Sequence, residues 1–320
     1  MKKHPKNTNC FPQIIYVTGK GGVGKSTIAM LIGEALANEG KRCILVELNG
    51  NRVIPNYYNL SSLGYKELRL LPNLYCLSIS PEEAIQEYLL QQLKFKTIVE
   101  LFTKNKVISP LLQNAPGLHD AVQLGKIYSL AEQDNWDHVI IDGPATGHGE
   151  ILLDAAKTLM DMTQIGPMYQ SNKIVDHVLR DHNRCKIIIV TLLEEMVVQE
   201  TMQLLSSFGQ RSDRKNQMGA IVINRYQNRL MNIDPSEIDA VSIESLQNRL
   251  NAINEHIREH NEHVELEVKQ YNRLQSFLKQ KGVFDVPSLK IPFLSDLTGS
   301  KAQLYLQMLS VLEQAEGSSL

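Results

Sequence analysis

The chain has 320 residues, and its 43% hydrophobic content can bury a sizeable core in one large domain or two smaller ones. Its 33 Lys and Arg residues nearly balance 35 Asp and Glu residues, so the overall charge does not favour nucleic acid or an anionic membrane as a partner. The four cysteines form no C-x-x-C pair, and no stretch is apolar enough to span a bilayer. We therefore expect a cytoplasmic protein without a zinc site or an integral membrane segment.

Short runs rich in Ile and Val predict a parallel sheet that helices cover on both faces. Such strands are apolar throughout, whereas strands with one solvent-exposed face alternate in polarity. The predicted strands are residues 13–18, 42–48, 74–79, 138–142, 186–192, 218–224 and 290–293. A helix is predicted over 26–39, between the first two of these strands, with Gly40 as its stop signal.

The remaining helices are predicted from their start signals and composition. Ser80, Pro81 and Glu83 form a strong helix start, and the helix runs toward residue 93. Residues 94–135 are expected to be mostly helical, and the polar stretch 236–281 to form a solvated helical hairpin over the sheet. We predict a single α/β domain over residues 1–320, with helical insertions at about 81–135 and 228–285.

A phosphate-binding loop follows the first predicted strand. Residues 19–26 fit the pattern G-x-x-x-x-G-K-S, in which backbone N–H groups surround a phosphate at a helix N-terminus. The glycines let the backbone approach phosphate oxygens, Lys25 places an ammonium on the β- and γ-phosphates, and Ser26 offers a hydroxyl to Mg²⁺. The predicted nucleotide-binding residues of this loop are Gly21, Gly22, Val23, Gly24, Lys25, Ser26 and Thr27.

A second acid completes the expected metal site. Asp142 ends the apolar run 138–142, where a Walker B carboxylate would hold Mg²⁺ through water. The alternative is a strand-end aspartate that only caps a turn.

An additional lysine makes the loop more specific. With Lys20, the string reads K-G-G-x-G-K-S-T, which resembles the deviant Walker A motif of the MinD/ParA/ArsA group of ATPases. In that group the extra lysine reaches across a dimer interface to the partner's nucleotide. Residues 142–148, which read DGPATGH, resemble the D-x-A-P-T-G-H switch II of the ArsA family. This family includes arsenite-pump ATPases and the cytosolic factor that targets tail-anchored membrane proteins.

The resemblance to the ArsA family extends over most of residues 13–300. Residues 191–201 resemble its V-x-x-P-E-x-x-x-x-E-T stretch, and Asn224 falls where an asparagine reads adenine. Pro292 falls in the segment that lines the base, and His148 where a histidine senses the γ-phosphate. The resemblance implies a three-layer P-loop NTPase fold, ATP and Mg²⁺ as cofactors, and a homodimer or a heterodimer with a paralogue. It also implies a client protein with an apolar segment.

Two departures from the family pattern affect the expected chemistry. The family's switch I carries two acids in T-D-P-A-H-x-x-x-D, and the matching positions here are Asn49 and Asn56. An amide orients water but is a very poor base, so we assign Asn56 to water positioning and expect slow hydrolysis or a different catalytic group. The zinc-binding C-x-x-C of the tail-anchored-protein factor is also missing, so a dimer would form without that metal.

Several alternatives remain open from the sequence. A spatial organiser of the MinD/ParA kind would bind a membrane or DNA as a dimer, although the C-terminal residues form no basic amphipathic helix. A nucleotide-gated scaffold with little hydrolysis would fit the two asparagines. The apolar residues within 88–112 would form either a client groove or ordinary core, and the sequence does not name the client.

Overall fold

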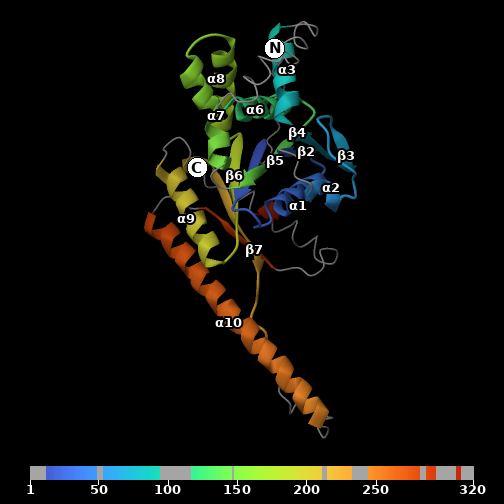
Figure 1. The fold of residues 1–320 in the computed structure, drawn as a ribbon, viewed down its shortest axis with the longest axis vertical. Helices are drawn as coiled ribbons and strands as arrows, with labels where there is room; N and C mark the ends of the chain where they lie inside the picture. Colours follow the sequence, from blue (N-terminus) through green and yellow to red (C-terminus); the bar gives the residue numbers. More distant parts are fainter. Residues whose placement is uncertain are drawn as a thin grey trace, which may run out of the picture.

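A computed structural model describes residues 12–48, 53–93, 117–145, 148–210, 215–232, 244–281, 286–292 and 308–310. Its centre is an eight-stranded sheet with the order β3-β4-β2-β5-β1-β6-β7-β8. All neighbouring strands in this sheet are parallel except β3, which is antiparallel to β4. The predicted α/β fold with a mostly parallel sheet is therefore confirmed (Figure 1).

The parallel strands arise from the apolar runs that predicted them. Their bounds are β1 Ile14–Gly19, β2 Cys43–Leu48, β4 Leu74–Ile79, β5 His138–Ala145, β6 Cys185–Thr191, β7 Met218–Tyr226 and β8 Ser288–Pro292. The sequence did not predict β3 (Leu68–Leu71), a short and largely exposed edge strand. A turn at Asn73, whose φ is 61°, joins β3 to β4 as an antiparallel hairpin. Too little of β3 is buried for its apolar residues to form a recognisable pattern.

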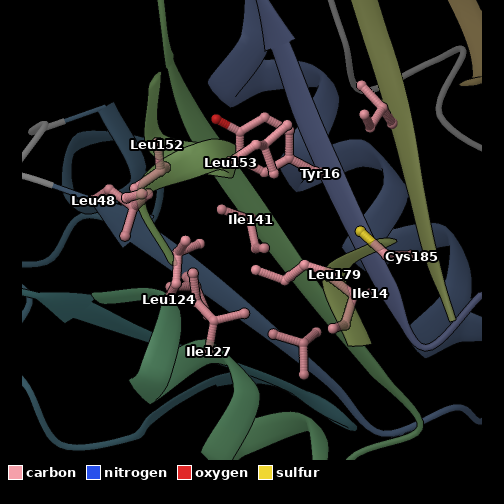
Figure 2. Packing of buried hydrophobic residues seen from close by; sticks show 14 of the residues in the cluster. Ile14, Tyr16, Leu48, Leu124, Ile127, Ile141, Leu152, Leu153, Leu179 and Cys185 are labelled. Carbon is pink, nitrogen blue, oxygen red and sulfur yellow. The ribbon is translucent and has the colours of Figure 1, made fainter. Parts of the chain in front are cut away.

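Helices cover both faces of the sheet (Figure 1). Helix α1 (Lys25–Asn38) packs on one face, against apolar residues that include Ile15 and Leu45. The opposite face is covered by α6 (Leu118–Ala131), α7 (His148–Thr163), α8 (Pro167–Arg180) and α9 (Glu195–Gln210). Figure 2 shows part of this second core, where Leu124 and Ile127 of α6 approach Ile141 of β5. Burial of these side chains on both faces accounts for the uninterrupted apolar character of the strands.

The start of α3 (Pro81–Leu93) confirms the predicted helix start at Ser80. The Glu83 backbone N–H donates to Ser80 Oγ at 3.3 Å, and the Ser80 hydroxyl donates to Glu83 Oε2 at 2.7 Å. Two short elements also lie in the described part of the chain: α2 (Val53–Tyr57) and the 3₁₀ turn η1 (Lys215–Gln217). Most of residues 94–135, expected to be helical, lie outside the described residues, but α6 confirms a helix in their second half.

The predicted helical hairpin over the sheet is wrong for the polar stretch of the second half. Residues Glu244–Lys281 form one helix of 38 residues, α10, and much of it extends away from the sheet (Figure 1). Its C-terminal part packs on the core through Leu274 and Leu278, which are buried. Toward its other end only a narrow stripe, including Leu250 and Ile257, is buried. A helix with so narrow an apolar stripe has little reason to lie flat on a sheet.

A buried histidine at the start of β5 should make stability depend on pH. His138 is fully buried, and its Nδ1 lies 2.9 Å from the carbonyl oxygen of Pro12, so this nitrogen carries the proton and donates it. Burial lowers the pKa of His138 from its ordinary value of 6.5. As the pH falls, His138 therefore binds a proton more readily in the unfolded chain than in the folded protein. The free energy of unfolding therefore keeps its full value above the ordinary pKa of histidine. Below that pH it falls, and His138 contributes at most about 1.4 kcal/mol per pH unit to the fall.

Urea unfolding at about pH 7.5, 6.5 and 5.5 measures this dependence. His138→Gln is expected to remove this one-proton contribution to the slope, while exposed His256→Gln, at 83% side-chain exposure, should leave it unchanged. An unchanged slope in His138→Gln would show that other groups cause the loss.

Candidate nucleotide-binding site

The predicted phosphate-binding loop lies between β1 and α1, with the geometry that a phosphate cradle needs. Gly22 and Gly24 have positive φ values of 84° and 94°, a conformation that other residues rarely adopt. Gly24 is the N-cap of α1, so the free backbone N–H groups at the start of this helix face the loop. A Cβ at Gly21 or Gly22 would meet no described atom within 4 Å, which leaves the outer side of the loop open.

Three predicted side chains converge where this loop joins the helix. Lys25 donates from Nζ to the carbonyl oxygen of Lys20 at 3.0 Å, so its ammonium lies across the loop. Asp142, 4% exposed on β5, accepts a hydrogen bond from the side chain of Ser26. Burial lowers the pKa of Lys25 and raises that of Asp142, and the two charges partly offset these shifts. The sheet order accounts for this convergence because β5 lies directly beside β1.

This donor set fits a nucleoside triphosphate with Mg²⁺. Asp142 Oδ1 is buried and has no hydrogen-bond partner among the described residues, although burying such an acceptor is costly. Hydroxyl and carboxylate oxygens are ligands that Mg²⁺ prefers, and its remaining positions are usually water and phosphate. The glycine loop and Lys25 would hold the phosphates, and Ser26 and Asp142 would hold the metal.

Lys20 forms an ion pair within its own chain. Its Nζ lies 2.7 Å from Glu200 Oε1, and about a third of each side chain is exposed, at 32% and 35%. Glu200 lies on α9, which a buried hydrogen bond between Thr191 and Thr201 fastens to β6 at 2.9 Å. The sequence had singled out both the lysine and the 191–201 stretch, but had not predicted that they meet.

Asn224 contacts the loop from β7. Its Nδ2 donates to the carbonyl oxygen of Val23 at 2.8 Å, and a Cβ at Gly24 would lie 2.4 Å from that same nitrogen. Asn224 therefore supports the loop directly, and its part in reading adenine stays a prediction. Pro292 ends β8 and pairs with Tyr226 of β7, the strand that also carries Asn224.

Comparisons with known proteins agree with this geometry. The family model described as anion-transporting ATPase, that is the ArsA ATPase, matches residues 12–166. ATPase BagA of Mycobacterium tuberculosis is 31% identical over 220 residues, which cover 65% of this chain and 64% of BagA. An arsenical pump-driving ATPase of Escherichia coli is 24% identical over 210 residues, covering 59% and 36%, respectively. The ATPase get3 of Schizosaccharomyces japonicus is 30% identical over 141 residues, covering 42% and 41%.

Residues 12–166 of this chain are therefore similar to the ArsA family of ATPases. The chain spans just under two thirds of the length of BagA, at 64%. The part matched by the family model contains the loop, Lys20, Lys25, Ser26 and Asp142.

Other predicted residues are less completely placed in the structure. Asn56 lies on α2 with an exposed side chain, and its assigned role in positioning water stays a prediction. Asn49, Thr146 and Gly147 lie outside the described residues. The backbone of His148 begins α7, but its side chain is not described, so its switch role also stays a prediction.

The apolar stretch within 88–112 is described only to residue 93. Tyr88 and Leu89 pack against the core, whereas Leu90 is 38% exposed. A cavity of about 420 Å³ lies beside them, on the side of the sheet opposite α1. Its apolar lining includes Tyr88, Leu118, Val122, Leu159, Met168 and Val175. The stretch therefore contributes to the core and also borders a cavity.

The three cysteines in the described part of the chain are all buried. They are Cys43, Cys76 and Cys185. Burial raises the pKa of Cys76 to about 12, which makes its thiol a poor nucleophile. Among the described residues, no helix is both long and apolar enough to cross a membrane.

Proposed function

We propose that this protein binds and hydrolyses ATP with Mg²⁺, and that the bound nucleotide switches it between a monomer and a dimer. The bound Mg²⁺–ATP would supply phosphoryl transfer to water. The observation that carries the proposal is the pair of lysines on one phosphate loop. Lys25 lies across the loop, and Lys20 lies at its edge in an ion pair whose side chains are about one third exposed. Only Lys20 is placed to exchange its partner without taking the loop apart.

Dimerisation would replace Glu200 by a phosphate as the partner of Lys20. An exposed ion pair contributes only about 0.2–1 kcal/mol, so releasing Lys20 costs little. A lysine directed at the γ-phosphate of the facing subunit would stabilise charge that develops there, as an arginine finger does. The Lys20–Glu200 pair would therefore hold the lysine in the free monomer and release it in the ATP-bound dimer.

Substitution of Lys20 tests this proposal. Lys20→Ala is expected to lower ATP turnover by at least about 100-fold, because the group that stabilises transferred charge is lost. ATP-dependent dimerisation, measured by light scattering with a non-hydrolysable analogue, should also be lost. Binding of ATP to the monomer should remain within about threefold, since Lys25 and the glycine loop supply the local contacts. Unchanged turnover and dimerisation in Lys20→Ala would refute a role for Lys20 across the interface.

Glu200→Gln is the matched variant, because it removes the competing charge and keeps the shape. It should strengthen ATP-dependent dimerisation by up to about fivefold for each ion pair released. Weaker dimerisation in Glu200→Gln would instead mean that Glu200 itself contributes to the interface.

A second function is favoured by the switch I region. Asn56, at the position of the family's second acid, is exposed and uncharged, which supports a nucleotide-gated scaffold with little hydrolysis. A phosphate-release assay separates the two functions, because turnover at an ordinary ATPase rate is incompatible with the scaffold.

The partner would be a second copy or a paralogue, and the client a protein with an apolar segment. The cavity between α3, α6, α7 and α8 supports such a client, because apolar side chains line most of it. We place this reaction in the cytoplasm, where ATP and reduced cysteines are both maintained.

A further inference from the structure

Glu47 is a buried carboxyl beside the candidate site, at the start of the segment that matches switch I. Glu47 lies on β2 and is only 1% exposed. Its side chain accepts a hydrogen bond from Ser78, on the neighbouring strand β4. The other oxygen, Oε1, is buried without a hydrogen-bond partner among the described residues. A glutamate in this state inside an apolar strand needs a physical reason, because its burial is costly.

The sheet places Glu47 next to Asp142. These two residues are direct partners in the parallel register of β2 and β5, so their side chains project from the same face. That face is the one covered by α1, because Leu45, Ile140 and α1 share one core cluster. Both residues lie near the carboxyl ends of their strands, the edge at which α/β proteins bind ligands.

The charges at this edge are incompletely balanced. Asp142 Oδ1 is the second buried acceptor there without a described hydrogen-bond partner. Lys25 is the cation that acts on Asp142. Two adjacent buried carboxyls with one lysine leave a deficit of positive charge, which a divalent cation would supply.

We propose that Glu47 is the second carboxylate of the magnesium–nucleotide site, holding a water molecule of the same Mg²⁺ that Asp142 holds. This inference rests on the proposed function and adds a residue to it. Glu47 acts here as a positioning residue, through water and not on the substrate. It supplies a carboxylate near switch I, where Asn49 and Asn56 provide only amides.

Titration of Mn²⁺ into the protein with a non-hydrolysable ATP analogue, followed by electron paramagnetic resonance, tests this role. Glu47→Gln keeps the size of the side chain and removes its charge. We expect it to weaken Mn²⁺ binding by about 10-fold, because outer-shell partners of metals typically contribute 10- to 100-fold. Nucleotide affinity in EDTA should not change. Stability without nucleotide should not fall, since a neutral amide is easier to bury than a carboxylate.

Glu34→Gln is the matched control. Glu34 is another buried glutamate, 3% exposed, but it lies on α1 and not on a strand beside Asp142. Its carboxylate accepts a hydrogen bond from the Tyr58 hydroxyl at 2.8 Å. Its substitution should leave Mn²⁺ affinity unchanged. If Glu47→Gln does not fold, Glu47→Asp shortens the side chain and should still weaken Mn²⁺ binding by at least about threefold.

Unchanged Mn²⁺ affinity in whichever Glu47 variant folds would overturn the inference and leave the proposed function intact. If the wild-type protein bound the ATP analogue neither with Mn²⁺ nor in EDTA, the proposed function itself would fail. The role proposed for Glu47 would then fail with it.

Discussion

Gly19→Ala is expected to prevent stable folding, with a loss of at least about 3 kcal/mol in the free energy of unfolding. Gly19 ends β1 with a φ of 147°, and an added Cβ would lie 2.1 Å from the carbonyl oxygen of Val190. That oxygen belongs to the backbone of the adjacent central strand β6, so it cannot rotate away as a side chain would. Separation of β1 from β6 would disrupt the middle of the sheet. Urea unfolding measured by circular dichroism provides the test.

Gly21→Ala, two residues further along the same loop, is the control for this substitution. Its Cβ would meet no described atom within 4 Å, and the backbone of Gly21 has no positive φ. Stability should therefore change by less than about 1 kcal/mol. The same methyl group would stand where the phosphates approach, so ATP affinity should fall by at least about 10-fold. Equal stabilities of the two variants would contradict the packing of Gly19 against β6.

Lys25→Ala is expected to weaken ATP binding by at least about 100-fold, because charge-assisted hydrogen bonds to phosphate are among the strongest in proteins. The ammonium lies over the loop, 3.0 Å from the carbonyl oxygen of Lys20, and burial has already lowered its pKa. The folded protein without nucleotide therefore gains little from this charge. Its unfolding free energy should change by less than about 1 kcal/mol, whereas isothermal titration should show the loss of ATP affinity.

Lys126→Ala serves as the control for Lys25→Ala. Lys126 is another partly buried lysine, paired with Glu87 at 2.9 Å on the opposite side of the sheet. Its loss should reduce stability modestly and leave ATP affinity unchanged. If Lys25→Ala bound ATP like the wild type, the phosphate loop would have to hold another ligand.

Local patterns were sufficient for the elements that carry the phosphate loop. The apolar runs predicted the positions of the seven parallel strands, and the start signal at Ser80, Pro81 and Glu83 predicted the start of α3. The glycine spacing placed a cradle before Lys25, as the φ values of Gly22 and Gly24 now show. These features depend on neighbours within a few residues, or on burial that every strand of a covered sheet shares.

The sequence was less informative where exposure or distant contacts decide the structure. Strand β3 has too little buried surface to show a pattern, and α10 extends as one helix because only a narrow stripe of it is apolar. Helical periodicity in 244–281 was detectable, but whether the stretch folded back as a hairpin depended on contacts made elsewhere.

The sequence by itself determined that this protein has a P-loop with an additional lysine, since both are encoded in eight consecutive residues. Only the tertiary structure decided which partners those residues meet. The order of the strands brings Asp142 and Glu47 to one edge, and the docking of α9 brings Glu200 to Lys20. Such pairings join positions from 95 to 180 residues apart, and no local spacing encodes them, because they follow from how the whole sheet and its helices pack.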